Sequence, residues 1–488
     1  MIWLTGAIGS ITVIRRAKSC LAKSRYIACA VLVAVSIGSI WFAQSITTEE
    51  MLFADEPVAN APIGIAKGIH PGRVVWVHDP DATDWNGPGD GHWWESNHTS
   101  QGVVGEMMSR AVRTLSGEQS DIAAWDALFR HFNKAHGKGT AGYKSGEKIL
   151  IKVNFVGCIR IWNRSEVTKM EDYNLKNTDY MNTSPQMIIA LLRQLVDEAG
   201  VNETDITVGD TLCYFPNEFY NMCHQQFPNV RYLEYLGEFG RTAAKSSSIP
   251  LYWSTPDAAG STTDYIPASY AEAEYLINLA NLKSHNDQAG VTLCAKNHYG
   301  SLVRKPARSP DYYNLHKDLP FSTPGMGHYR PLVDLMGHKH LGGKTLLYLI
   351  DGLYAGKHAK ERAPRKWNSQ PFDGDWSSSL FVSQDPVAID SVGFDFLWVE
   401  WDDAPHRSGT NDYLVEAALA DDPPSDTFYD PDHKGNKTRL ASQGVYEHWD
   451  NPTDRQYSRN LGTGQGIELV KLTEARQNEV ATLALSAK

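Results

Sequence analysis

The chain has 488 residues, of which 42% are hydrophobic and 21% are charged, and its formal net charge is −11. This composition is that of a globular protein, and the absence of heptads and tandem repeats excludes coiled-coil and solenoid proteins. No basic stripe is present, so we expect no nucleic-acid partner.

The N-terminal 50 residues differ from the rest. Five basic residues and no acidic residue occur in the first 25 positions, and residues 26–43 contain no charge. A basic flank before an apolar segment predicts either a cleaved export signal or a retained membrane anchor, followed by a polar linker to about residue 70. Because the basic side stays in the cytoplasm, we expect an exported protein. It would be periplasmic or anchored to the inner membrane, with the membrane touched through this segment only.

The next elements follow in chain order. Residues 74–79 form the first expected strand, and a polar loop rich in Gly, Asp and Trp follows it. Apolar residues at helical spacing predict helices at 102–115 and 121–135. Residues 148–155 read KILIKVNF and predict a buried strand. Ser184 and Pro185 then supply the start signals of a helix that ends at Gly200.

Strands and helices alternate through the rest of the core. Strands are expected at 205–210, 275–282, 344–352 and 380–386, and helices at 291–300, 330–341 and 387–401. Continuous apolar strands that alternate with helices predict an α/β fold with a mainly parallel sheet covered by helices on both faces. We expect this domain to span residues 71–400. Residues 401–488 are rich in loops and are expected to pack on the domain as an extension.

Polar side chains follow the ends of five predicted strands. Ligands of parallel sheets bind beyond the carboxyl ends of the strands, so we expect these side chains to share one edge. They are Lys152 with Asn154, Asp210, Asn281 with Lys283 and His285, Asp351, and Asp385.

Each of these residues has a structural alternative. An aspartate at a strand end caps the next helix or forms a turn, which we favour for Asp210, Asp351 and Asp385 taken singly. Lys152 lies in an apolar strand, where a lysine needs a partner or loses its charge. For Lys283 with His285 we favour function.

Further polar residues suggest an anion or metal site. Lys152, Lys283 and Lys296 with Asn154 could hold a carboxylate, phosphate or sulfate. A divalent metal could instead be held by histidines and aspartates, namely His285, His298, His316, Asp210, Asp351, Asp385 and Asp390, with the four aspartates as the main ligands. Lys296, Asn297 and His298 share one helical turn, so they cannot all face one ligand.

Cysteine usage is sparse beyond the apolar segment. No C-x-x-C motif is present, so we expect no iron–sulfur cluster. Cys213 and Cys223 either form a disulfide in an oxidising compartment or stay as buried thiols.

Together these motifs resemble the DUF362 family, whose name states that its function is unknown. The resemblance covers about residues 145–400, through LIKVN, TVGD, INLANLKSH, VTLCAKNHYG, LIDG and SQDPVAIDSV. It implies a fold and a polar site but no reaction. Some relatives carry ferredoxin-type cysteine clusters, which this chain lacks. The family's polar motifs correspond to Lys152, Asn154, Asp210, Lys283, His285, Lys296, Asn297, Asp351, Asp385 and Asp390.

These observations favour an enzyme that acts on a small anionic molecule such as a sugar acid, with or without a metal. Lys152, Lys283, His285 and Lys296 would be catalytic, with His285 as acid or base and a lysine near developing negative charge. Asn154, Asn297 and His316 would bind substrate. Two alternatives stay open: a non-catalytic protein that binds an anion or metal, and a redox or metal-handling accessory protein.

Overall fold

In the computed structural model, residues 54–488 form one compact unit. The described residues are 58–159, 167–255, 264–286, 288–304, 312–358, 361–433, 439–474 and 476. The predicted export signal or anchor at residues 1–50 lies outside them, and so do residues 51–57 of the linker. Among the helices that the structure describes, none has the length and apolarity needed to cross a bilayer.

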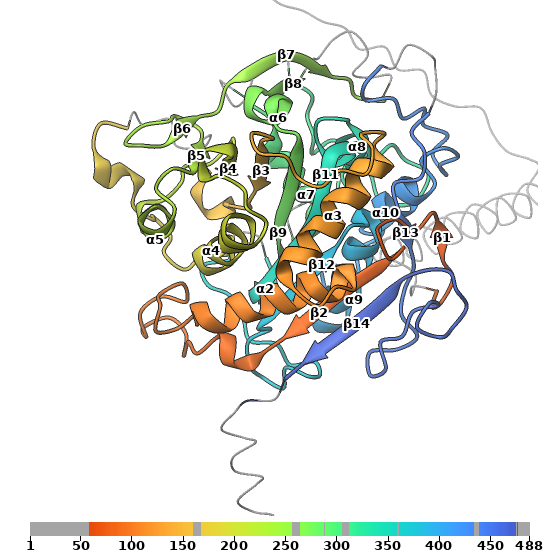
Figure 1. Cartoon of the computed structure of the whole chain (residues 1–488). Helices are drawn as coiled ribbons and strands as arrows, with labels where there is room; N and C mark the ends of the chain where they lie inside the picture. The colour runs from red at the N-terminus through yellow and green to blue at the C-terminus, as the bar shows by residue number, and fades with distance from the viewer. Residues whose placement is uncertain are drawn as a thin grey trace, which may run out of the picture. The chain divides into compact units, whose positions relative to one another are not determined.

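One large sheet organises the unit (Figure 1). Its main path has the order β14-β2-β12-β11-β9-β3-β4-β5-β6, and β10 pairs with β9. The strands are β2 (Arg73–His78), β3 (Ile149–Lys152), β4 (Ile206–Gly209), β5 (Arg231–Glu234), β6 (Thr242–Ala243), β9 (Tyr275–His285), β10 (Gly290–Thr292), β11 (Thr345–Gly356), β12 (Ser379–Ser383) and β14 (Glu468–Thr473).

Along this path every strand except β12 runs in the same direction. β12 is antiparallel to both of its neighbours, β11 and β2. A parallel return needs a crossover element, and the described part of residues 357–378, which joins β11 to β12, contains no helix. The sheet is therefore mainly parallel, as predicted, with one reversed strand near its middle.

Helices cover both faces of the sheet. Because side chains alternate along a strand, Ile149 and Ile151 of β3 enter one core while Leu150 enters the other. The first core is covered by α2 (Gln101–Ser116), α3 (Asp121–Ala135), α4 (Pro185–Arg193) and α5 (Asn217–Gln226). The second is covered by α6 (Ala268–Glu272), α7 (Cys294–Asn297), α8 (Pro331–Gly337), α9 (Pro386–Glu400) and α10 (Asp412–Ala418).

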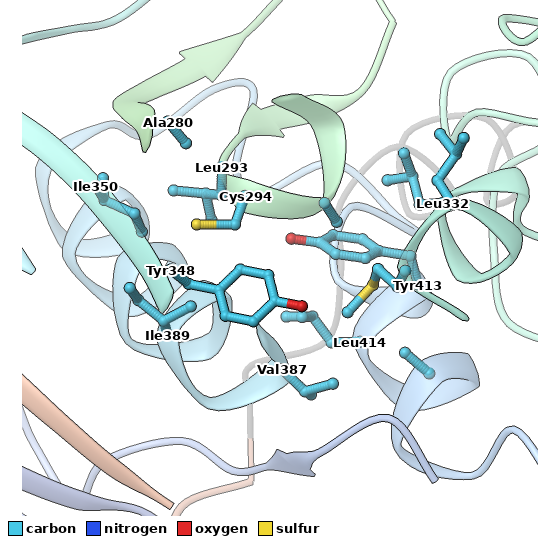
Figure 2. Packing of buried hydrophobic residues seen from close by; sticks show 14 of the residues in the cluster. Ala280, Leu293, Cys294, Leu332, Tyr348, Ile350, Val387, Ile389, Tyr413 and Leu414 are labelled. Carbon is cyan, nitrogen blue, oxygen red and sulfur yellow. The ribbon is translucent and has the colours of Figure 1, made fainter. Parts of the chain in front are cut away.

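The second core joins β11 to α7 and α9. Figure 2 shows Tyr348 and Ile350 of β11 among Leu293 at the start of α7 and Val387 and Ile389 of α9. All of these side chains are almost fully buried. Burial of this kind contributes about 1.5–3 kcal/mol per large apolar side chain, so α7 and α9 are held firmly against the sheet.

The C-terminal segment is part of the sheet and not only a layer on it. β14 pairs in parallel with β2 over its whole length. β13 (Val445–Tyr446) pairs with β1 (Ile63–Gly64), so the N-terminal part of the described chain meets the C-terminal segment beside α9. A separate ribbon is formed by β7 (Ser246–Leu251) and β8 (Asp264–Pro267).

The four cysteines of the folded unit are buried free thiols. Cys213 and Cys223 therefore form no disulfide, and the thiol alternative holds. Burial, and then the charge of Asp210, raises the pKa of Cys213 well above its usual range.

Candidate functional site

A buried ion pair marks the carboxyl ends of β3 and β4. Lys152 is the last residue of β3, and its Nζ lies 2.7 Å from Oδ2 of Asp210, which follows β4. The two side chains are 0% and 5% exposed. Lys152 also donates to the backbone oxygen of Val153 and to Oδ1 of Asn297. These contacts satisfy a buried charge that would otherwise be costly.

Lys283 is the second buried lysine at this edge. Its Nζ donates to Oδ1 of Asn154 at 2.8 Å and to the backbone oxygen of Met181 at 3.0 Å. Both acceptors are neutral, and among the described residues no carboxylate pairs with it. Burial, and then repulsion by Lys296, lowers the pKa of Lys283 to about 7. The amine is therefore poised between its two protonation states near neutral pH.

Two asparagines connect the lysines. Oδ1 of Asn297 accepts from Lys152 Nζ at 3.0 Å and from Asn154 Nδ2 at 3.1 Å. Because Asn154 also accepts from Lys283, one chain of hydrogen bonds joins the two ammonium groups. This series of hydrogen bonds runs across the strand ends, from Asn297 of α7, on one face of the sheet, to Lys283 of β9.

Asn278 and His298 extend the network; the sequence suggests His298 only as a candidate metal ligand and gives Asn278 no role. Asn278 Nδ2 lies 3.1 Å from Nε2 of His298, and Asn278 Oδ1 accepts from Asn297 at 2.8 Å. Burial, and then the charge of Lys152, lowers the pKa of His298 to about 3, so the imidazole is neutral. The sequence did contain one signal for Asn278: it is an asparagine within an apolar strand, where a buried side-chain amide needs hydrogen-bond partners.

Gly300 brings backbone against the ion pair. A Cβ built at this position would lie 2.5 Å from Oδ2 of Asp210 and 2.8 Å from Nζ of Lys152. The Gly300 carbonyl accepts from Oγ1 of Thr211 at 2.8 Å, which fixes the segment after α7 to the segment after β4. A residue without a side chain is required here for space.

Three further predicted residues make contacts with aromatic or imidazole rings. His285 ends β9, is half-buried, and its ring centre lies 6.1 Å from that of His358. Lys296 Nζ lies 3.7 Å from the centre of the Tyr299 ring. His316 is exposed, and its ring meets the ring of Tyr299 edge-on, with the two ring centres 5.6 Å apart. Lys296 and His316 thus converge on one tyrosine.

Asp351 and Asp390 are not part of the ion pair, and each binds backbone amides, although the charge of Asp351 also acts on Lys283. Asp351 accepts from the amides of Ser184, the N-cap of α4, and Leu353. Asp390 accepts from the amides of Cys294 and Ala295 at the start of α7. Both carboxylates therefore fix backbone in place.

Asp385 departs furthest from expectation. It caps α9 by accepting from the amides of Val387 and Ala388. Because β12 runs against its neighbours, its carboxyl end lies at the opposite edge of the sheet from Lys152 and Asp210. The prediction that all five strand ends share one edge is wrong for this strand, while the capping alternative is confirmed.

The four aspartates predicted as metal ligands therefore bind different partners at different places. In the part of the chain that the structure describes, no three His, Cys, Asp or Glu side chains gather in a way that could hold a metal ion. Their oxygens already accept N–H groups or a lysine, so these four residues do not fit a shared metal site.

One family model matches the middle part of the chain. The family model described as Domain of unknown function (DUF362) matches residues 168–395. This span contains Asp210, Lys283 and Asn297 but not Lys152 or Asn154. No curated protein and no solved structure gave a significant match.

Proposed function

Because the matching family model, DUF362, describes a domain of unknown function, we propose an activity for this protein from the network at the strand ends. We infer that the protein is an enzyme that moves a proton on a small anionic substrate, such as a sugar acid or another carboxylate. The proposal covers the reaction class and the substrate class.

The carrying observation is the contrast between the two buried lysines. Lys152 is paired with a carboxylate, whereas Lys283 meets only neutral oxygens among the described residues. Lys283 can therefore release a proton near neutral pH and take one back, which is the requirement for a general base or acid. An anionic substrate would favour its charged form.

The paired lysine has a different task in this proposal. Lys152 forms an ion pair with Asp210, and its ammonium group would stabilise negative charge that develops on the substrate. His285, two residues beyond Lys283 on the same side of β9, would exchange the proton with solvent. The proposal requires an opening at the strand ends, because Lys152 and Lys283 have no exposed surface.

The test is hydrogen exchange in deuterated water. The protein would be incubated with a panel of 2-hydroxy acids, 2-oxo acids and uronic acids, and loss of C–H signals would be followed by proton NMR. We expect exchange in at least one acid, with a loss of about 100-fold or more in Lys283→Met.

Lys344→Met is the matched control. Lys344 is also a buried lysine bound to neutral oxygens, including the backbone oxygen of Ala273, but it lies beside the amino end of β11. Exchange that fell equally in both variants would reflect lost stability. Exchange that persisted in Lys283→Met would contradict the assignment of the base.

A second candidate function is capture of a small anion without turnover. It is favoured by the same neutral surroundings of Lys283, because a bound anion would supply the missing counter-charge. Calorimetric binding of a carboxylate that depends on Lys283, without any C–H exchange across the panel, would support this candidate over the enzyme.

We also propose that the protein acts outside the cytoplasm, on the basis of the basic and apolar N-terminal segment. Fractionation of cells that express the full chain would test this. Recovery in the cytoplasmic fraction would contradict it.

A further inference from the structure

A second chain of hydrogen bonds joins α9 to the segment around β13. Nδ1 of His448 bonds to Oδ1 of Asp395, and Nε2 of His448 bonds to the hydroxyl of Tyr446. Asp395 belongs to α9 and is the last residue of the family match, whereas Tyr446 and His448 lie beyond it. This phenol–imidazole–carboxylate chain shares no residue with the lysine network.

The partners fix the proton positions. An ionised carboxylate only accepts hydrogen bonds, so the Nδ1–H of His448 donates to Asp395. Nε2 is then free to accept from the hydroxyl of Tyr446. A base in contact with a hydroxyl, and itself oriented by a carboxylate, is the arrangement that activates nucleophiles in acyl transfer.

Further contacts hold the two ends of the chain. Asp395 Oδ2 accepts from the hydroxyl of Tyr457 at 2.7 Å and from the amide of Trp449 at 3.2 Å. Asn411 Nδ2 donates to the hydroxyl oxygen of Tyr446 at 2.7 Å. That donor would stabilise negative charge on the phenol oxygen when its proton moves to His448.

Of the three side chains, only that of Tyr446 is partly accessible to a reagent. Asp395 and His448 are buried, whereas Tyr446 is partly exposed on β13. Burial, and then the charges of Asp395 and Asp412, raises the pKa of Tyr446. The resting phenol therefore keeps its proton, and a base is needed to remove it during reaction.

We propose that Tyr446 is the nucleophile of a second reactive centre that accepts an acyl group from an activated ester. The phenol oxygen forms a bond to the acyl carbon, and the bond from that carbon to the leaving oxygen breaks. The phenolic proton passes to Nε2 of His448 and then to the leaving oxygen. Tyr446 and His448 are the catalytic residues, and Asp395 is a positioning residue.

The experiment uses 4-nitrophenyl acetate, with acetylation of each tyrosine followed by peptide mass spectrometry. Tyr265, which is 42% exposed, serves as the internal reference. We expect Tyr446 to acetylate about 100-fold faster than this reference, since a positioned base contributes at least that much. In His448→Gln the new amide can still form hydrogen bonds but cannot act as a base, so the acetylation rate of Tyr446 should fall to that of Tyr265.

The pH profile of the unaltered protein gives an independent readout. With His448 as base, the Tyr446 rate should level off once an imidazole is neutral, whereas a free phenol gains rate up to about pH 10. If Tyr446 reacts no faster than Tyr265, or if its rate keeps rising to pH 10, the proposal is overturned. The three residues would then be a structural hydrogen-bond chain.

Discussion

Lys152 and Lys283 show how partners decide the state of a buried lysine. Both side chains are fully buried at the same edge of the sheet. Lys152 has a carboxylate at 2.7 Å, whereas Lys283 has an amide oxygen and a backbone oxygen. Neutral acceptors compensate desolvation less than an opposite charge does, and burial lowers the pKa of Lys283 to about 7.

Gly300 offers a direct test of how tightly the ion pair is enclosed. In Gly300→Ala the new methyl group would meet Asp210 and Lys152 at distances below 3 Å. Relief requires either the backbone or the ion pair to move, so we expect a loss of about 1–3 kcal/mol in the free energy of unfolding. Urea denaturation measures this change.

Gly105→Ala is the control, for which we expect the free energy of unfolding to change in the opposite direction. Gly105 lies inside α2 with open space around its Cα, and alanine is the better helix former. We expect this variant to gain up to about 1 kcal/mol. Equal stability of Gly300→Ala and the wild type would show that the ion pair can move freely.

At the scale of elements, Asp385, the N-cap of α9, holds more than the helix that follows it. Asp385 accepts from two amides of α9 and also from the amides of Lys67 and Val445. One carboxylate thus ties together the described N-terminal segment, α9 and β13. The cap is a junction of three segments that are distant in the sequence.

Asp385→Ala should therefore cost more than an ordinary cap. Loss of the cap and of partners for two further amides should lower the free energy of unfolding by about 3 kcal/mol or more. Ser120→Ala, which removes the exposed cap of α3, should cost only about 1 kcal/mol.

The C–H exchange activity of Asp385→Ala should stay unchanged at temperatures where the variant is folded. Loss of that exchange would place Asp385 in the reaction.

The direction of β12 shows what the sequence could not predict. Apolar runs and helix caps were enough to predict β3, β9, β11 and α4, because buried strands and capped helices have strong local signals. The reversal of β12 depends on the path of residues 357–378, which has no local signature. Asp385 was therefore predicted to lie at the carboxyl edge of the parallel strands.

At the scale of the whole molecule, the same limit applies to the C-terminal segment. β14 lies at the edge of the sheet, and its side chains range from buried Leu469 to exposed Lys471 on the same face of the strand. Such a mixed pattern is weak compared with that of a central strand, so residues 401–488 were predicted as loops. Pairing with β2 makes this segment part of the fold.

The stability of the whole fold should report the state of Lys283. Its pKa is about 7 in the folded protein and 10.5 in a model lysine. Between these values the unfolded chain binds more protons than the native one, so stability rises with pH across this window. Below pH 7 both states are charged and the dependence ends.

Urea denaturation of wild type and Lys283→Met at pH 6, 7, 8 and 9 isolates this effect, because other titrating groups cancel in the difference. Between pH 7 and 9 the wild type should gain stability over the variant by about 1.4 kcal/mol per unit. The difference for Lys344→Met should begin to rise only near pH 8, where the pKa of Lys344 lies. A difference for Lys283→Met that is flat up to pH 9 would mean that Lys283 stays charged. Its role as the proton-transferring base would then be lost.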